Sequence, residues 1–557
     1  MKWHRLIIMA TLLCPLPGMA ADAPDDFDDF MNESMKGFDT FISDANRDFI
    51  DFMRHPWKKY EGKEPEKKRV VPEPPQMPVY DPKAPESKEP PKQLTIKEIL
   101  DLTTEEGKQG STTTAQGGEP VTPAPAPTPE PKPEPKPTPT PTTPTVPKTP
   151  TTPTPESKPT PKPDTVKVVK PTPKPTPTPT SPTTPSTPTK PSMTSPLYSG
   201  GAGRTKITFM GIDYHVSNAL DKVVTLKGID ENSLADGLET LYKSNYKPLL
   251  DDLRTMRSKD LGNDWALYLV VKKIAEQFGG KNESVLMRQF LLNNLGFRAR
   301  MAKVIQKNAL TLLVAPASQL YGCAFIAEGD AKFYDVESDQ PYSYKMCSRE
   351  APDAKNKIDM SMRQTPRFAG GRKSSSHQGS RYKAAASASV PVELMEFYNQ
   401  MPQCDYGVYA TANVDQKFSD ELLDALRPAI KGKSEREAAN ILLDFVQSGF
   451  DYATDPEQFG YEKPFFVEEL FYYPKCDCED RSMLYRYLVT KLLGLDVILL
   501  DYPNHIATAV RFNSDVPGDF VVGGGGKYIV CDPTFIGAPV GMAMPQFKNV
   551  AADLLKY

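Results

Sequence analysis

Three residues that together can perform acyl transfer follow one another near the end of the chain. Cys478, His505 and Asp532 occur in that order and at equal intervals. A thiol needs a base to become nucleophilic at neutral pH, and the base needs a hydrogen-bonded partner that fixes its tautomer. His505 is the only histidine after His377, so this part of the chain offers no other imidazole. The pattern predicts a triad in which Cys478 is the nucleophile, His505 the base and Asp532 the residue that orients the base.

The residues after Cys478 predict the helix that would carry it. Apolar side chains recur there at helical spacing, and Gly494 is a suitable stop: Met483, Leu484, Tyr487, Leu488 and Leu492. A helix N-terminus presents free N–H groups and partial positive charge, so we expect it to lower the pKa of Cys478. Strand-like runs over 497–502, 506–512 and 527–532 would then place His505 at the start of one strand and Asp532 at the end of another.

This arrangement resembles the transglutaminase-like superfamily of papain-like fold. The resemblance covers about 434–541 and rests on Cys-x-Asp-x-Ser at 478–482, the histidine that starts a strand, and Asp-Pro-Thr at 532–534. It implies an α+β fold, a thioester on Cys478, proton transfer by His505, and no cofactor. Cys476 stands where the family commonly has glycine. The backbone N–H of Cys478 would serve the oxyanion, with a possible hydroxyl from Tyr461, Tyr472 or Tyr473.

An earlier segment repeats the pattern without its reactive groups. Gly280 aligns with Cys478 and Asn282 with Asp480, the histidine position falls near Lys307 and Asn308, and Asp335 aligns with Asp532. We therefore expect a degenerate transglutaminase-like domain over 198–346 and a catalytic one over 392–557, with an interdomain linker over 347–391. Residues 367–383 are rich in Gly, Ser and basic side chains, which indicates a solvated stretch or a basic patch for an acidic partner.

The remaining segments predict export and modular organisation. Residues 1–20 are typical of a signal peptide, although Cys14 leaves a lipoprotein as the alternative, and they predict a periplasmic or secreted protein. Apolar residues at helical spacing over 21–60 predict an amphipathic helix that packs on its own protein or docks a protein partner. Residues 61–197 read as a disordered linker, because 120–196 hold half of the 58 prolines, and would separate that helix from the catalytic part.

Composition and charge limit the function classes. A net charge of −4 gives no electrostatic reason to expect nucleic acid as a partner, and no later apolar run is long enough for stable membrane insertion. Cys323 and Cys347 are an open possibility for a disulfide. Water as acceptor predicts a cysteine peptidase or amidase acting on a peptide or protein, whereas an amine acceptor predicts a cross-linking transglutaminase. The alternatives are a metal site at Cys476, Cys478 and His505, or a non-catalytic binding or scaffold protein.

Overall fold

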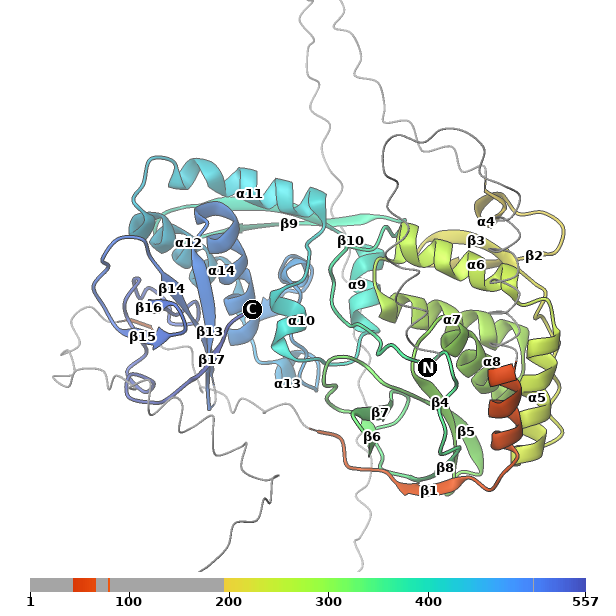
Figure 1. The fold of residues 1–557 in the computed structure, drawn as a ribbon. Helices are drawn as coiled ribbons and strands as arrows, with labels where there is room; N and C mark the ends of the chain where they lie inside the picture. The colour runs from red at the N-terminus through yellow and green to blue at the C-terminus, as the bar shows by residue number, and fades with distance from the viewer. Residues whose placement is uncertain (1–43, 67–78, 81–194, 504) are drawn as a thin grey trace, which may run out of the picture. The chain divides into compact units, whose positions relative to one another are not determined.

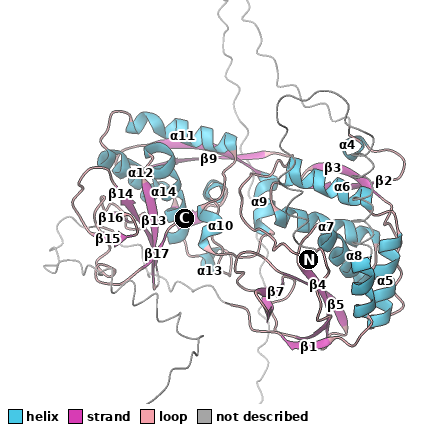
Figure 2. Cartoon of the chain, in the orientation of Figure 1, coloured by secondary structure: helices cyan, strands magenta, loops and turns pink. Residues whose placement is uncertain are grey.

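A computed structural model of the protein describes residues 44–66, 79–80, 195–503 and 505–557 (Figure 1). Helices and strands occur in both halves of this region, which confirms the prediction of an α+β protein (Figure 2). The predicted signal peptide and most of the Pro-rich linker lie outside the described residues. Among the described residues, no helix is both long and apolar enough to cross a membrane.

In the first half, helices pack on a sheet of strands β4–β8, to which the early strand β1 is added. A hairpin and four helices come first: β2 (Arg204–Phe209), β3 (Ile212–Ser217), α5 (Glu231–Lys243), α6 (Lys247–Met256), α7 (Asp264–Phe278) and α8 (Lys281–Asn294). The sheet strands follow: β4 (Ala299–Val304), β5 (Ala309–Val314), β6 (Ala324–Glu328), β7 (Ala331–Asp335) and β8 (Ser343–Met346). An early strand, β1 (Lys58–Glu61), pairs with β8 at the edge, and α8 packs against β4 and β5.

The second half again places helices before a sheet. Its main helices are α9 (Val392–Asn399), α10 (Tyr406–Ala410), α11 (Gln416–Ile430), α12 (Glu435–Gly449) and α14 (Cys478–Leu493). Its sheet contains β13 (Asp496–Tyr502), β14 (His505–Arg511), β15 (Phe520–Gly523), β16 (Gly526–Cys531) and β17 (Asp553–Leu555). Between α12 and α14 lie short elements: β11 (Asp451–Tyr452), α13 (Asp455–Gln458), η3 (Val467–Phe471) and β12 (Lys475–Cys476).

The two sheets share one strand order. Apart from the added β1, the first sheet runs β8-β4-β5-β7-β6 and the second runs β17-β13-β14-β16-β15. In each half a long buried helix directly precedes the first central strand, α8 before β4 and α14 before β13. All the pairings within both sheets are antiparallel. Corresponding positions of the two halves can therefore be compared strand by strand.

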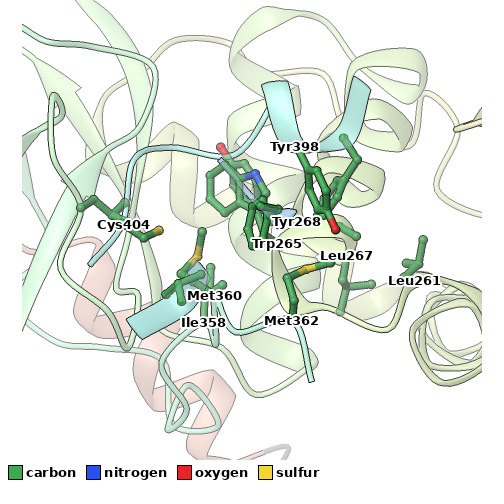
Figure 3. Packing of buried hydrophobic residues seen from close by; sticks show 14 of the residues in the cluster. Leu261, Trp265, Leu267, Tyr268, Ile358, Met360, Met362, Tyr398 and Cys404 are labelled. Carbon is green, nitrogen blue, oxygen red and sulfur yellow. The ribbon is translucent and has the colours of Figure 1, made fainter. Parts of the chain in front are cut away.

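The segment expected to be an interdomain linker is packed. Ile358, Met360 and Met362 are buried beside Trp265 and Tyr268 of α7 (Figure 3). Their spacing of two sends all three side chains to one face of an extended chain, which explains why the segment covers the helix. Farther along, β9 (Arg372–Gln378) and β10 (Ala385–Pro391) form a hairpin, and β10 packs on α11. The solvated stretch expected over 367–383 therefore includes the strand β9. Its side chains are all polar and are exposed or half-buried, and its pairing with β10 makes it a strand.

The N-terminal part of the described chain packs on the first half. Residues 44–53 are helical, and Phe49, Ile50 and Met53 are buried. Arg54 pairs with Asp236 and Glu239 of α5 at 2.5 and 3.0 Å. Residues 44–53 therefore pack against their own protein, as in the first of the two predicted arrangements, in which the helix does not dock a partner.

The expected linker also begins with ordered contacts. Lys63 forms a bridge with Phe325, and Glu66 accepts a hydrogen bond from Lys332 at 2.6 Å. Tyr80 donates its backbone N–H to Ile536 in the second half at 2.8 Å. The linker boundary at residue 61 was therefore placed too early, because short polar segments gain order from pairing with sheet edges and loops that the sequence does not reveal.

Truncating the helix at residues 44–53 should reduce stability. We expect Phe49→Ala to lower the free energy of unfolding by about 3 kcal/mol, because Phe49 is 2% exposed in the core of the first half. Phe52→Ala is the matched control on the same helix, since that ring is only half-buried. Chemical denaturation followed by circular dichroism measures both. Equal effects of the two variants would contradict the packing of this helix.

Candidate active site

His505 and Asp532 form a buried pair. The Nε2 atom of His505 lies 2.9 Å from Oδ2 of Asp532, and the two side chains are 3% and 2% exposed. His505 starts β14, and Asp532 directly follows the neighbouring β16. The ring of Phe547 stacks on the imidazole at 4.9 Å between centroids. The predicted contact between His505 and Asp532 is thus present. Because Nε2 of His505 is hydrogen-bonded to Asp532, Nδ1 is the ring nitrogen left for the thiol.

Asp532 is held by the loop that follows it. Its Oδ1 accepts the backbone N–H groups of Thr534 and Phe535 at 2.9 and 3.2 Å. From α12, Gln447 Nε2 donates to the carbonyl oxygens of Asp532 and Phe535, at 2.9 and 2.7 Å, and to that of Ala538. The Asp-Pro-Thr sequence therefore folds as a tight turn that fixes the carboxylate, and Gln447 is a positioning residue that the sequence did not reveal.

Replacing Gln447 should loosen this turn. We expect Gln447→Leu to destabilise the protein by about 2–4 kcal/mol, because it leaves several buried carbonyl groups without a donor. Gln416→Leu is the control, since that side chain is exposed and donates to Asp420 on the same helix at 2.7 Å. Thermal unfolding compares the two variants. A midpoint for Gln447→Leu that matches the wild type would show that the turn holds without this side chain.

Cys478 is the first residue of α14, as predicted, and the start of this helix is anchored against β14. Ser482 Oγ donates to the carbonyl of Ile506, the residue after His505, at 3.0 Å. The fully buried Arg481 donates to the carbonyl of Gln447 at 3.0 Å, which ties the helix to α12. Gly494 ends the helix in the left-handed conformation, with φ 67°. The structure therefore brings the three triad residues to one helix end and two adjacent strands.

The thiol of Cys478 is buried, and its surroundings disfavour the thiolate. Cys478 is 3% exposed, and burial together with the carboxylates of Glu479 and Asp477 holds its pKa well above the ordinary value. The Sγ atom lies 3.2 Å from Oε2 of Glu479, to which the thiol donates. A backbone hydrogen bond at Ile506 acts in the opposite direction but is weaker. The expected lowering by the helix N-terminus is thus wrong for this state, because adjacent negative charge and desolvation outweigh the dipole.

Five acidic side chains gather beside the thiol: Asp455, Glu462, Asp477, Glu479 and Asp480. Burial, followed by the charges of neighbouring carboxylates, raises the pKa of Asp455 to about 9 and those of Asp477 and Asp480 well above their usual range. Oxygen atoms of Asp455, Asp477 and Asp480 lie within 4.8 Å of one another, as do those of Asp455, Glu462 and Glu479. Such a cluster is compatible with folding when it holds protons or a hard cation such as Ca²⁺.

Two tyrosines that were not predicted from the sequence lie near Cys478. Tyr406 in α10 and Tyr452 in β11 are half-buried, and desolvation followed by the charges of Cys478 and Glu479 raises their pKa values. The three tyrosines expected to serve the oxyanion have other surroundings. Tyr461 is 56% exposed, Tyr473 donates to Asn399 at 2.8 Å, and the ring of Tyr472 lies under Lys373.

The other cysteines are separate buried thiols. Cys476 is 2% exposed, lies 3.7 Å from the carbonyl of Asp451, and has its pKa raised by burial to about 11. Cys323 and Cys347 are free thiols rather than a disulfide. Among the described residues, the groupings that could hold a metal ion consist of carboxylates alone, so the alternative site at Cys476, Cys478 and His505 is not formed.

No family model, curated protein or solved structure matches this chain. The assignment of the site therefore rests on its own geometry.

The corresponding place in the first half lacks the reactive groups. Gly280 caps α8 where Cys478 opens α14, and Ala309 starts β5 where His505 starts β14. Lys307 and Asn308, expected near the histidine position, lie in the turn before β5. Asp335 ends β7 and is buried, with Oδ1 accepting a hydrogen bond from Thr311 at 3.0 Å. The aspartate position is kept there, whereas the positions of Cys478 and His505 hold residues that carry neither a thiol nor an imidazole.

Proposed function

We propose that the second half is a transglutaminase-like cysteine acyl-transfer enzyme that works as a peptidase or amidase. The observation that supports it most is the buried pair of His505 and Asp532 at 2.9 Å, next to the helix end that carries Cys478. A fully desolvated imidazole–carboxylate pair beside a thiol is the arrangement that nucleophilic catalysis needs. The shared strand order supports the further proposal that the halves are two copies of one fold, of which the first is degenerate.

We propose a mechanism in which these groups have the roles that the resemblance implies. His505 takes the proton of the Cys478 thiol, and the sulfur attacks the carbonyl carbon of an amide. His505 then gives that proton to the leaving amine as the C–N bond breaks, which leaves a thioester on Cys478. Water attacks the thioester, His505 accepts its proton, and the carboxylic acid departs as the thiol is restored. Asp532 fixes the tautomer throughout and stabilises the imidazolium that forms in each half-reaction.

Access to the thiol is part of this proposal. Cys478 is 3% exposed, and Tyr406 is near enough for the Cys478 charge to affect its pKa. Asp405, the residue before Tyr406, accepts hydrogen bonds from the hydroxyl of Tyr321 at 2.9 Å and from the backbone N–H of Gln319 at 3.1 Å. A substrate reaches the buried thiol only if the structure around it moves, and we propose residues 405–410 as the segment that moves. Export to the periplasm or outside the cell remains the location that residues 1–20 predict.

Acyl transfer to a single cysteine tests the proposal. We expect p-nitrophenyl acetate to acetylate Cys478 in preference to the other five described cysteines, because Cys478 is the thiol that we propose His505 activates. Peptide mass spectrometry locates the acetyl group. The label should be lost in His505→Ala and retained in His215→Ala, which removes a half-buried histidine of β3. If His505→Ala were labelled at Cys478 as strongly as the wild type, or if another cysteine were labelled more, a binding or scaffold protein would be the better explanation.

An amine added to the same reaction separates the two enzyme classes. With glycine methyl ester present, a hydrolase should still release acetate, whereas a cross-linking enzyme should transfer the acetyl group to the amine. We expect hydrolysis to dominate. A product that is mostly N-acetylglycine methyl ester would assign the protein to the cross-linking class.

A further inference from the structure

The first half contains a pocket at the place where the second half carries its triad. Its volume is about 170 Å³. Gly280 and Lys281 contribute the N-terminus of α8, Leu310 comes from the start of β5, and Glu337 follows the end of β7. In the second half the equivalent elements carry Cys478, His505 and Asp532. The pocket therefore lies at the helix end and strands of the first half that correspond to those carrying the triad in the second.

Polar atoms without partners line this pocket. Ser284 and Arg288 are each 3% exposed, and both contribute to the pocket wall. In the described part of the chain neither Oγ of Ser284 nor Nε of Arg288 has a hydrogen-bond partner. Buried donors and acceptors are nearly always paired in folded proteins, because an unpaired polar group loses its hydration without compensation. These two atoms indicate that a polar ligand completes the site.

The charges around the pocket favour a ligand with one negative charge. The N-terminus of α8 is not capped by a side chain, and its first N–H groups carry partial positive charge. The ammonium group of Lys281 makes no ion pair with any described residue, so its charge is also uncompensated. The nearby carboxylate of Glu337 is already paired with Arg288 at 2.6 Å and with Lys272 at 2.9 Å.

Two more carboxylates adjoin the site and limit the ligand charge. Glu276 lies 3.8 Å from Lys272, and Glu283 accepts the backbone N–H of Leu226 at 3.0 Å. Together with Glu337 they would repel a doubly charged phosphate more strongly than a monoanion. The volume of about 170 Å³ leaves room for a carboxylate on a short chain.

We propose that the first half binds a carboxylate at the N-terminus of α8, with Lys281 and Ser284 as its recognising side chains. The ligand is the free carboxylate of a peptide C-terminus or of a small acid. This gives the degenerate half a binding role of its own that needs neither Cys478 nor turnover. The helix N–H groups and the Ser284 hydroxyl would donate to the carboxylate oxygens, while Lys281 neutralises the charge.

Calorimetric titration of the full chain with N-acetylglycine tests this site. We expect saturable binding, with N-acetylglycinamide at least about tenfold weaker because the amide carries no charge. Lys281→Gln should weaken the binding of N-acetylglycine by about tenfold, and Ser284→Ala should weaken it by a smaller factor. Lys273→Gln is the matched control, an exposed lysine on α7 that does not line the pocket. It should bind as tightly as the wild type.

Parallel titrations with a tripeptide and with acetate distinguish the two sources of the carboxylate. Tighter binding of the peptide assigns the site to C-termini, and comparable binding assigns it to small acids; both support the proposal. Three results would overturn it: no saturable binding of N-acetylglycine, binding that Lys281→Gln leaves unchanged, or inorganic phosphate binding more tightly than N-acetylglycine. Matching circular dichroism spectra of all variants ensure that loss of binding is not loss of fold.

Discussion

Cys478→Ala should reduce ester and peptide hydrolysis by at least about 10⁴-fold, since loss of a catalytic nucleophile leaves only the background set by the rest of the site. The fold should be retained, because alanine keeps the helix start and the change removes a single sulfur atom. We expect the thermal midpoint to move by no more than about 3 °C. Steady-state release of p-nitrophenol and circular dichroism on the same samples measure both quantities.

Cys476→Ala is the internal control for that variant. Its thiol is two residues away and equally buried, yet it contacts the carbonyl of Asp451 rather than the triad. Hydrolysis by this variant should stay within about twofold of the wild type. If Cys478→Ala kept its activity, or if the two cysteine variants lost it equally, Cys478 would not be the nucleophile.

The carboxylates beside the thiol should make stability fall as the pH rises. Asp455 keeps its proton up to a pKa of about 9 in the folded state, whereas an aspartate in an unfolded chain loses its proton near ~3.9. The folded state therefore binds more protons between these limits, and the free energy of unfolding decreases with pH there. From pH 5 to pH 8 in the presence of a chelator, we expect a loss on the order of a few kcal/mol. Thermal unfolding in a pH series measures it.

Asp455→Asn isolates this contribution. The amide cannot ionise but can still accept the backbone N–H of Lys463, so the variant should be more stable than the wild type at pH 8 and less sensitive to pH. Asp339→Asn, at the surface of the first half, should change neither property. Added Ca²⁺ should also reduce the loss of wild-type stability between pH 5 and pH 8, because the cation would neutralise the carboxylates in place of the protons. Stability that rises from pH 5 to pH 8 under chelation would contradict the raised pKa values.

Local patterns were sufficient to predict the elements that carry the triad. The helix from Cys478 to the left-handed Gly494, and the strands that begin near His505 and end near Asp532, follow from periodicity and stop signals that depend on neighbouring residues only. The hydrogen bond between His505 and Asp532 joins two strands, and it was predicted from the order of the triad residues and the resemblance that they carry. Strand β15 was missed, because Gly-rich sequence around it reads as loop and its pairing with β16 is a tertiary effect.

The protonation state of the thiol was not predictable in this way. It depends on the burial of the thiol and on the carboxylates of Glu479 and Asp477 beside it. The sequence shows that acidic residues adjoin Cys478, but it does not show that the thiol and these carboxylates are buried. Burial strengthens the effect of the carboxylates on the pKa of the thiol. The packed segment at Ile358 was missed for a similar reason, because its partner, α7, lies far away in sequence.

The contacts at Tyr80 and at α4 (Pro196–Ser199) change how the Pro-rich region is connected. Tyr80 is held at Ile536, four residues after Asp532, while Leu197 of α4 is buried in the core. The described residues before position 81 and after position 194 therefore belong to one folded unit, although they are far apart in sequence. A single protease cut between these two positions should yield two fragments that stay associated through β1 and the helix at residues 44–53, and separate only on denaturation.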